Sequence, residues 1–206
     1  MRWKTDQKAG WGRVHTASVE LARPERANMV DAIMADTPAP AIGMCRSYGD
    51  ACLNDNGRAV QMTRLDRILS FDDATGVLEV EAGAQIGELS RIFAPKGWLP
   101  PVMPGTGFAT VGGGIAMDVH GKNHHGAGSF GCHVESLQLA TGNGVKTVKA
   151  GTPLFKATVG GLGQTGIIVS ARLKMLRAKG DVMVVTERRV KDLDHFLQLF
   201  DASDAT

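Results

Sequence analysis

Apolar side chains recur along this chain with two periods, one typical of strands and one typical of helices. Residues 165–175 place an apolar side chain at every second position from Ile167 to Met175, and this alternation predicts a long strand. Residues 85–93 instead repeat apolar side chains at helical spacing, and the pattern predicts a helix there. The chain therefore mixes both kinds of element.

Shorter segments of the same two kinds complete the expected order of elements. Strands or extended segments are expected at residues 19–21, 41–42, 59–62, 68–71, 77–81, 98–102, 134–141, 145–149, 165–175 and 182–187. Helices are expected at residues 24–35, 85–93, 153–158 and 190–200. This order predicts an α+β fold, with a shift in composition near residues 177–181 where a new unit would begin.

Composition narrows the classes of protein that fit. The 206 residues suit one large domain or two small ones, and 43% apolar with 21% charged residues are globular values. A formal net charge of +2 gives no reason to expect a nucleic-acid partner. Three cysteines without a CxxC motif favour a reducing compartment. With no apolar leader and no membrane-length apolar run, the expectation is a cytoplasmic protein.

The stretch at residues 104–131 is dense in glycine and holds three of the six histidines. Glycine has no Cβ, so a backbone rich in it can lie flat against a ligand. Successive N–H groups in such a segment can also converge on an anion. The stretch therefore predicts a site that wraps a large, flat cofactor carrying phosphate.

The loop at residues 43–50, called the first loop below, is the second candidate for chemistry. Gly43 and Gly49 bracket Arg46 and Ser47, which offer a fixed cation and a hydroxyl to a phosphate. A plain turn explains these residues equally well. The loop lacks the GxGxxG motif, so a Rossmann nucleotide site is disfavoured.

The histidines admit three interpretations. His120 and His124 have a spacing that suits one helix face, but Gly121 and Gly126 argue against a helix, and the HExxH motif of zinc enzymes is absent. Plain loop histidines are therefore favoured over a metal site. The strongest interpretation places His120 and Lys122 beside a redox ring, where they stabilise developing negative charge. No serine lies in a GxSxG motif, so hydrolase chemistry lacks support.

Four motifs follow one another in an order that resembles one family. They are GWGR, GMCRSYGD, PGTGFATVGGGIAMDVHGKNHHGAGSFG and LFKATVGGLGQTGII, and the resemblance spans nearly all of residues 10–175. This order resembles the FAD-linked oxidases with a vanillyl-alcohol-oxidase-type, or PCMH-type, FAD-binding domain. The resemblance implies an FAD-binding domain at residues 1–176, built of two α/β subdomains at roughly 1–75 and 76–176. It also implies that residues 177–206 begin a substrate domain that is incomplete here.

The resemblance implies a role for each segment around FAD. The first loop would cradle the pyrophosphate, the glycine-rich stretch would run along the flavin and phosphates, and a late glycine segment would close over the adenine and ribose. His120 and Lys122 are the implied catalytic residues, with Lys122 turned toward the substrate. The implied cofactor-binding residues are Gly43, Arg46, Ser47, Tyr48, Gly49, Pro104, Gly105, Thr106, Thr110, Val111, Gly112, Gly113, Ala116, His120, Gly121, Asn123, Gly161, Gly166 and Ile167.

Two departures from the family pattern matter. Many relatives carry a histidine that bonds covalently to the flavin, and Arg46 stands at that position, so we expect non-covalent FAD. Cys45 stands where relatives tend to have glycine, and it would be strained if the backbone there needs a positive φ.

The resemblance also implies a reaction. A hydride would pass from a sugar C–H to the flavin while a base takes the hydroxyl proton, with a polyprenyl-phosphoryl pentose as the implied substrate. A reductase partner would then complete an epimerisation. The alternatives are an aldonolactone or alditol oxidase, a non-catalytic FAD-binding module and, last, a zinc-binding loop protein.

Overall fold

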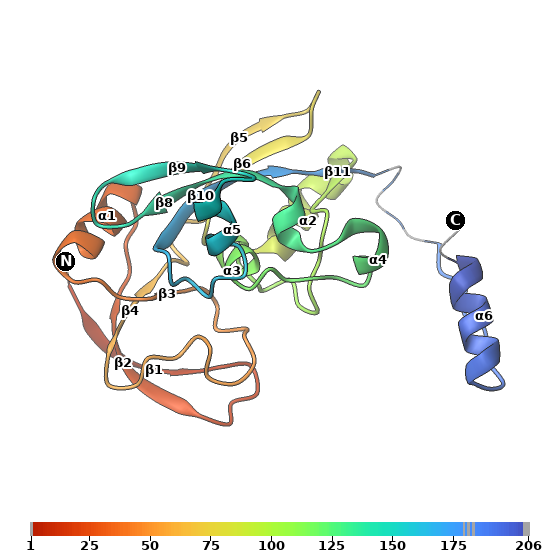
Figure 1. Cartoon of the computed structure of the whole chain (residues 1–206), viewed down its shortest axis with the longest axis horizontal. Coiled ribbons are helices and arrows are strands. Elements are labelled where there is room, and N and C mark those ends of the chain that lie inside the picture. Colours follow the sequence, from red (N-terminus) through yellow and green to blue (C-terminus); the bar gives the residue numbers. More distant parts are fainter. Residues whose placement is uncertain (1, 179, 181, 183, 204–206) are drawn as a thin grey trace.

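Two β-sheets of different size form most of the molecule, and short helices pack on them (Figure 1). The computed structural model describes residues 2–178, 180, 182 and 184–203. The smaller sheet has four strands in the order β1-β2-β4-β3, and the larger has five in the order β5-β6-β10-β8-β9. The mixture of sheets and helices is the predicted α+β class.

The smaller sheet combines one antiparallel pair with parallel pairs. Its strands are β1 (Lys4–Ala9), β2 (Thr16–Ala22), β3 (Ala41–Ile42) and β4 (Arg58–Gln61). β1 runs antiparallel to β2, whereas β4 pairs in parallel with both β2 and β3. Helix α1 (Ala27–Asp36) connects β2 to β3. Because β3 ends at Ile42, the first loop leaves the sheet directly at its edge strand.

Strand β1 was not predicted, because its sequence is polar throughout. It is an edge strand without a fully buried side chain, so it shows no apolar alternation. Charge pairs hold its side chains instead: Asp6 accepts from Lys8 at 2.9 Å and from Arg23 at 2.8 Å. These partners lower the pKa of Asp6, chiefly through the hydrogen bond from Lys8.

The larger sheet is antiparallel throughout. Its strands are β5 (Ile68–Asp72), β6 (Val77–Glu81), β8 (Val134–Ala140), β9 (Val145–Lys149) and β10 (Ile167–Lys174). All five lie within one or two residues of the predicted segments. The central strand β10 pairs with β6 on one side and β8 on the other. Since both of its faces are covered, six of its eight residues are buried.

The remaining elements are short. They are α2 (Ile86–Phe93), η1 (Ala94–Lys96), β7 (Trp98–Leu99), α3 (Val111–Ala116), α4 (His124–Ala127), η2 (Phe130–His133), α5 (Pro153–Thr158) and β11 (Leu176–Arg177). Helix α3 was missed because three consecutive glycines give it low helix propensity. Helix α4 corrects the expectation that Gly121 and Gly126 exclude a helix, since one turn forms after Asn123 and contains Gly126.

Two large apolar clusters make up most of the core, beside a small third one formed by Val19, Leu21, Ile42 and Ala59 of the smaller sheet. One lies under the larger sheet, where α2 and α3 contribute Ile86, Phe93 and Ile115. The other joins the two sheets, with Val30 of α1 packed among residues of β4 and β10. Because β5 pairs with β6, the chain passes from one sheet to the other between Gln61 and Ile68. That passage comes earlier than the expected subdomain boundary at residue 75.

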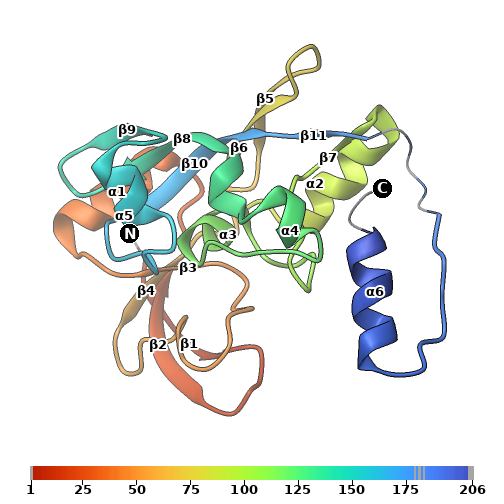
Figure 2. The ribbon, with the colours of Figure 1, turned by 45° about the vertical axis from the view of Figure 1, so that its right-hand side comes forward.

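The segment after β11 differs from the prediction. No strand forms at the described residues 182 and 184–187, where Val182 is 84% and Val184 93% exposed and no neighbouring strand pairs with them. Residue 183 lies outside the described residues. Helix α6 (Leu193–Ser203) does form, three residues later than expected, and stands apart from the two sheets (Figure 2).

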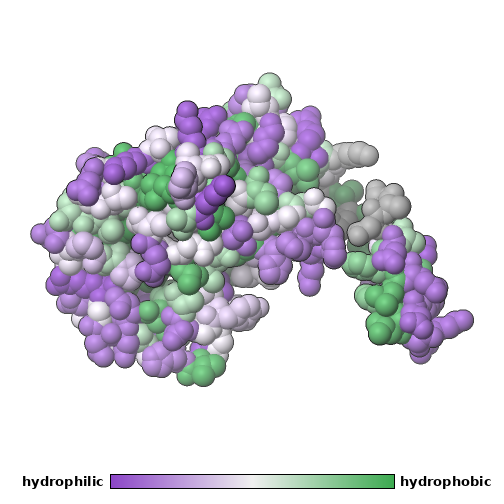
Figure 3. Space-filling view, viewed as in Figure 1, coloured by the Kyte–Doolittle hydropathy of each residue, from purple (hydrophilic) through white to green (hydrophobic). Residues whose placement is uncertain are grey.

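Helix α6 carries exposed apolar side chains on one face, among them Phe196, Leu197 and Phe200. In the space-filling view these appear as a green stripe along the helix (Figure 3). The His125 ring lies 5.3 Å from that of Phe200 and links α6 to the rest of the molecule. No helix within the described part of the chain is long and apolar enough to span a membrane.

Candidate cofactor-binding site

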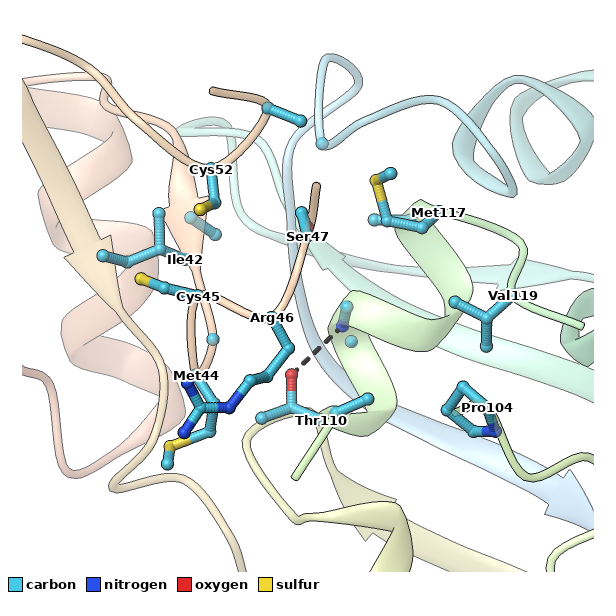
Figure 4. Close-up of a pocket in the computed structure, with 18 of the residues that line it drawn as sticks. Ile42, Met44, Cys45, Arg46, Ser47, Cys52, Pro104, Thr110, Met117 and Val119 are labelled. Atoms are coloured by element: carbon cyan, nitrogen blue, oxygen red, sulfur yellow. Dashed lines mark hydrogen bonds between the residues drawn. The ribbon is translucent and has the colours of Figure 1, made fainter. Parts of the chain in front are cut away.

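A cavity of about 460 Å³ lies between the first loop and helix α3 (Figure 4). Three segments far apart in the sequence line it: residues 41–52, residues 104–120, and residues 162–168. The middle segment is called the α3 wall below. In Figure 4, Cys45 and Arg46 of the first loop lie on one side, and Thr110, Met117 and Val119 of the α3 wall lie on the other.

The first loop leaves its backbone donors unused. Within the described part of the chain, none of the N–H groups of residues 43–50 donates a hydrogen bond to another protein group. The loop is instead held through acceptors, because the Trp11 N–H donates to the Ser47 carbonyl at 2.9 Å and the Leu53 N–H to the Asp50 carbonyl at 2.8 Å. Its N–H groups are therefore available to an anion.

Arg46 contributes a further unused donor. Its Nε is buried and has no hydrogen-bond partner. The guanidinium lies between two exposed aromatic rings, 6.0 Å from the centre of Trp11 and 5.4 Å from that of Phe108. A buried donor without a partner is rare in folded proteins, and it marks a place where an acceptor from outside the chain fits. Arg46 thus offers a cation and a donor at the mouth of the cavity.

The start of helix α3 uses its backbone donors within the protein. The Thr110 Oγ1 accepts from the Gly113 N–H at 3.2 Å and caps the helix (Figure 4). The Val111 N–H donates to the Ala84 carbonyl at 2.9 Å, and the Gly112 N–H to the Ala82 carbonyl at 2.8 Å. The first three donors of the helix are therefore occupied, and this wall presents a surface to the cavity instead of an anion site.

The two walls approach each other closely at one point. A Cβ added to Gly43 would lie 2.4 Å from the Thr110 Oγ1, nearer than any real contact of that kind. Glycine at position 43 therefore lets the first loop pass directly over the start of α3.

His120 lies at the end of the α3 wall and lines the cavity with an exposed side chain. Asp118, at φ +43°, holds the segment in place by accepting from the Ser129 hydroxyl and from the Gly131 N–H, each at 2.8 Å. The His120 ring lies 5.4 Å from that of His124. Among the described residues, no three His, Cys, Asp or Glu side chains gather as metal ligands do.

The structure brings most of the predicted site residues together around this cavity. Those that line it come from all three segments: Gly43, Arg46, Ser47, Tyr48, Pro104, Gly105, Thr106, Thr110, Gly112, Gly113, Ala116, His120 and Gly166. Tyr48 is 81% exposed and lies at the rim.

Other predicted residues do not line the cavity, and their environments explain why. Val111 is completely buried in the core, and Ile167 packs against α1 on the opposite face of β10. The Asn123 side chain donates to the Pro101 carbonyl at 2.9 Å, so it holds its own loop. Away from the cavity lie Gly49, Val111, Gly121, Lys122, Asn123, Gly161 and Ile167.

The structure also adds residues that the sequence analysis did not select. Trp11 belongs to the GWGR motif, to which the sequence analysis gave no role at the site, whereas Met117 and Val119 gave no signal beyond their place near His120. Ile168 replaces Ile167 because a register shift between Ile168 and Ser170 changes which side chains of β10 face the cavity. An irregularity of this kind cannot be read from alternation alone.

Cys45 and Cys52 also line the cavity. Cys45 adopts φ +52°, so the positive φ considered from the sequence is present at this position. A hydrogen bond from the Cys52 thiol lowers the pKa of Cys45 to about 7, with help from the positive charges of Lys8 and Arg46. The same contact raises the pKa of Cys52, which remains a neutral thiol.

These features define a domain that binds a nucleotide-type cofactor. They are the unused N–H groups of the first loop, the unpartnered Nε of Arg46 and the close approach of the α3 wall at Gly43. The family model described as FAD binding domain matches residues 22–151, more than half of the chain. The chain belongs to this family of FAD-binding domains.

Similar proteins agree with this assignment. The decaprenylphosphoryl-beta-D-ribose oxidase of Mycolicibacterium smegmatis is 42% identical over 181 residues, which are 83% of this chain and 39% of that protein. The D-lactate dehydrogenase of Anaerostipes hadrus is 27% identical over 187 residues, which are 79% of this chain and 38% of that protein.

A solved structure of alkyldihydroxyacetonephosphate synthase has the same fold, with a TM-score of 0.70 at 19% identity over 81% of this chain and 33% of that one. The chain thus spans less than two fifths of the length of each of these relatives.

The cavity residues fit FAD, the cofactor of this family. The buried Arg46 Nε and the unused N–H groups of the first loop suit the oxygens of a diphosphate. Ala116, Met117 and Val119 of the α3 wall supply an apolar surface that suits a flat ring. The predicted cofactor agrees with this geometry.

Proposed function

We propose that this chain is the FAD-binding part of a flavin-dependent oxidoreductase that oxidises an alcohol of a polyprenyl-phosphoryl sugar. The observation that carries the proposal is the 42% identity to a decaprenylphosphoryl-beta-D-ribose oxidase across 83% of the chain. That stretch includes the first loop, the α3 wall and β10, which together line the cavity.

The first loop binds the diphosphate of the cofactor in this proposal. Its unused N–H groups and the Ser47 hydroxyl donate to the phosphate oxygens, and Arg46 neutralises part of their charge. Because Arg46 cannot form the covalent bond that a histidine at this position would, the cofactor is held without covalent attachment.

The α3 wall orients the ring in this proposal. The N–H groups at the start of helix α3 are already hydrogen-bonded within the protein, which makes this part of the wall rigid. The side chains of Ala116, Met117 and Val119 exclude water from the face of the ring. When bound, FAD supplies the acceptor for the hydride that leaves the sugar carbon. His120 ends this wall and Lys122 follows it, and there an imidazole and an ammonium stabilise negative charge that develops next to the ring.

Residues beyond 176 begin the substrate-binding part in this proposal. The exposed apolar stripe of α6 and the ring contact between His125 and Phe200 support a substrate-binding part that lies beside His125. Transfer of the oxidised sugar to a reductase partner, which completes an epimerisation, belongs to the same proposal. A cytoplasmic location remains a prediction from the cysteine usage.

The cofactor is tested first, with the purified chain. We expect a flavin absorbance spectrum, either as isolated or after addition of FAD, and release of all yellow colour into the supernatant on acid precipitation. Colour retained in the pellet would show a covalent bond. A colourless chain that FAD does not reconstitute would contradict the proposed site.

The substrate is tested with the protein that continues beyond residue 206. We expect a polyprenyl-phosphoryl riboside to bleach the flavin under anaerobic conditions, and Lys122→Ala to slow this bleaching without loss of bound FAD. Bleaching by lactones or alditols alone would instead identify an aldonolactone or alditol oxidase. Bound FAD that none of these compounds reduces would identify a non-catalytic flavin-binding module.

A further inference from the structure

Two of the three cysteines lie together on the wall that the proposed function assigns to the cofactor. Both Cys45 and Cys52 line the cavity, and both pack against the same small cluster formed by β2, β3 and β4. Figure 4 shows both side chains beside Ile42; Cys45 lies near the start of the first loop, and Cys52 lies two residues beyond its end. Neither sulfur is bonded in a disulfide, and each is only partly buried.

We propose that Cys45 and Cys52 form a redox-active pair, which hydrogen peroxide converts to a disulfide and a thiol reductant restores. The disulfide would tie the start of the first loop to the residues just beyond its end. Nothing in the proposed oxidation of a sugar uses these two sulfurs, so the pair is a modification site distinct from the reaction.

The local chemistry supports the assignment of roles. Cys45 is the attacking sulfur, because the neighbouring Cys52 thiol lowers the pKa of Cys45 and so favours its thiolate. Cys52 keeps its proton and is the resolving thiol. The positive φ of Cys45 also favours formation of the disulfide. A non-glycine residue is strained at such a φ, so a shift of this segment toward Cys52 costs little free energy.

The reaction balances in two steps. The Cys45 thiolate attacks one oxygen of hydrogen peroxide, the O–O bond breaks, and hydroxide leaves while a sulfenic acid forms. The Cys52 sulfur then attacks the Cys45 sulfur, the S–O bond breaks, and water leaves with the Cys52 proton. Overall, two thiols and one peroxide give one disulfide and two waters.

The cavity also controls access to the pair. Because both sulfurs line the space that the proposed function assigns to FAD, a bound cofactor covers them. We expect saturating FAD to slow their oxidation about fivefold or more, since thiol reactivity follows exposure of the thiolate. This shielding rests on the proposed cofactor site, whereas formation of the disulfide does not.

The test is peptide mapping of the full chain after treatment with hydrogen peroxide and alkylation of the remaining thiols. We expect a linked peptide that joins Cys45 to Cys52, free Cys132, and full reversal by dithiothreitol. The link should form at a rate independent of protein concentration. A map in which Cys45 is overoxidised or joined to Cys132 of another copy, with no Cys45–Cys52 link, would overturn the proposal.

Three variants make the test specific. Cys45→Gly is compatible with the positive φ at this position, and Cys52→Ser preserves the size of the side chain. Both variants should therefore retain the circular dichroism spectrum of the folded chain but form no Cys45–Cys52 disulfide. Cys132→Ser is the matched control, because Cys132 lies outside the cavity, and it should leave the link intact. A link that forms equally fast with and without FAD would contradict the shielding but leave the disulfide established.

Discussion

The two sides of the cavity differ in whether their backbone N–H groups are already hydrogen-bonded: those of the first loop are not, and those at the start of helix α3 are. The first loop has few hydrogen bonds of its own, and the N–H groups of its residues 43–50 are unused within the described chain. Helix α3 in the opposite wall contains three consecutive glycines, yet the N–H groups of Val111, Gly112 and Gly113 already have acceptors in the protein. Glycine density therefore does not locate an anion site. The N–H groups that have no acceptor within the protein do indicate where an anion would bind.

This difference assigns separate tasks to the two walls. A wall with unused donors binds charge, and a wall with occupied donors holds its shape and supports a flat ligand. Glycine serves close packing at two points of these walls: a Cβ at Gly112 of the α3 wall would lie 3.0 Å from the Ala82 Cβ, and one at Gly43 of the first loop would collide with Thr110. Changes in the first loop should therefore affect affinity for FAD, and changes in α3 should mainly affect stability.

The largest effect is expected from removal of the Arg46 charge. Arg46→Met keeps most of the side chain between Trp11 and Phe108 but removes the unpartnered Nε. We expect FAD affinity to fall by about 30-fold, or about 2 kcal/mol for a charge-assisted hydrogen bond, in a fluorescence titration.

Arg177→Met is the matched control for this change. The Arg177 guanidinium also stacks on an aromatic ring, 4.8 Å from the centre of Trp98, but it lies outside the cavity. The Arg177→Met variant should leave FAD affinity unchanged. If Arg46→Met and Arg177→Met lower FAD affinity equally, the first loop does not bind the diphosphate.

The next effect concerns the contact between the walls. Gly43→Ala forces a methyl group against Thr110, and we expect the free energy of unfolding to fall by about 1.5 kcal/mol, as for other overpacked sites. Adding Thr110→Ala should recover part of this loss, because it removes the atoms that collide. Gly126→Ala, where an added Cβ meets nothing within 4 Å, is the control for a neutral change. Strictly additive effects in thermal unfolding would contradict the contact.

A smaller effect is expected from the helix cap alone. Thr110→Ala removes the acceptor of the Gly113 N–H and should lower the free energy of unfolding by about 1 kcal/mol. Thr152→Ala removes the equivalent cap of α5, where Thr152 Oγ1 accepts from the Phe155 N–H at 3.3 Å, and should cost about the same. Chemical unfolding measures both. A marked loss of FAD affinity in Thr110→Ala but not in Thr152→Ala would give the α3 wall a binding role that its occupied donors do not predict.

The smallest effect is a shift in pH dependence at Cys45. The pKa of Cys45 is lowered to about 7, first by the hydrogen bond from Cys52, then by Lys8 and Arg46 against the opposing charge of Asp6. A lowered pKa means that the reactive thiolate persists down to about pH 7. We expect alkylation of Cys45 by iodoacetamide to be half-maximal near that pH, below the usual value of about 8.5.

Replacement of Cys52 by alanine tests the cause of this shift. The midpoint should move upward in the variant, because the thiolate loses its donor. Cys132 in the same sample is an internal reference. An unchanged midpoint would assign the shift to Lys8 and Arg46 instead of the thiol pair.

Much of the fold was predictable because buried strands alternate. All five strands of the larger sheet were located, including the edge strand β5, which has no buried side chain but carries Ile68, Leu69 and Phe71. Strand β1 was missed because it is an edge strand that is polar except for Ala9. The strand expected at residues 182–187 had suitable residues but no neighbour to pair with among the described ones. Apolar side chains thus suggest where strands form, but they do not supply the pairing partner that a strand needs.

The site was predictable to the level of segments. The order of four motifs located the first loop, the α3 wall and the late glycine segment, and most selected residues line one cavity. The details depended on features without a sequence signal. Ile168 lines the cavity instead of Ile167 because of an irregular register, and the donors of α3 are occupied by carbonyls of residues 82 and 84, which lie far earlier in the chain.

Strand β10 has a consequence for how the chain acquires its structure during synthesis. It is the last strand of the larger sheet to leave the ribosome, yet it occupies the centre, between the β5-β6 hairpin and the β8-β9 hairpin. Until residue 174 has emerged, the two hairpins have no common partner, and β6 and β8 each present an open edge. Long-range pairings of this kind form slowly. The nascent chain therefore passes through a stage with two exposed apolar edges, at which binding by a chaperone would oppose aggregation.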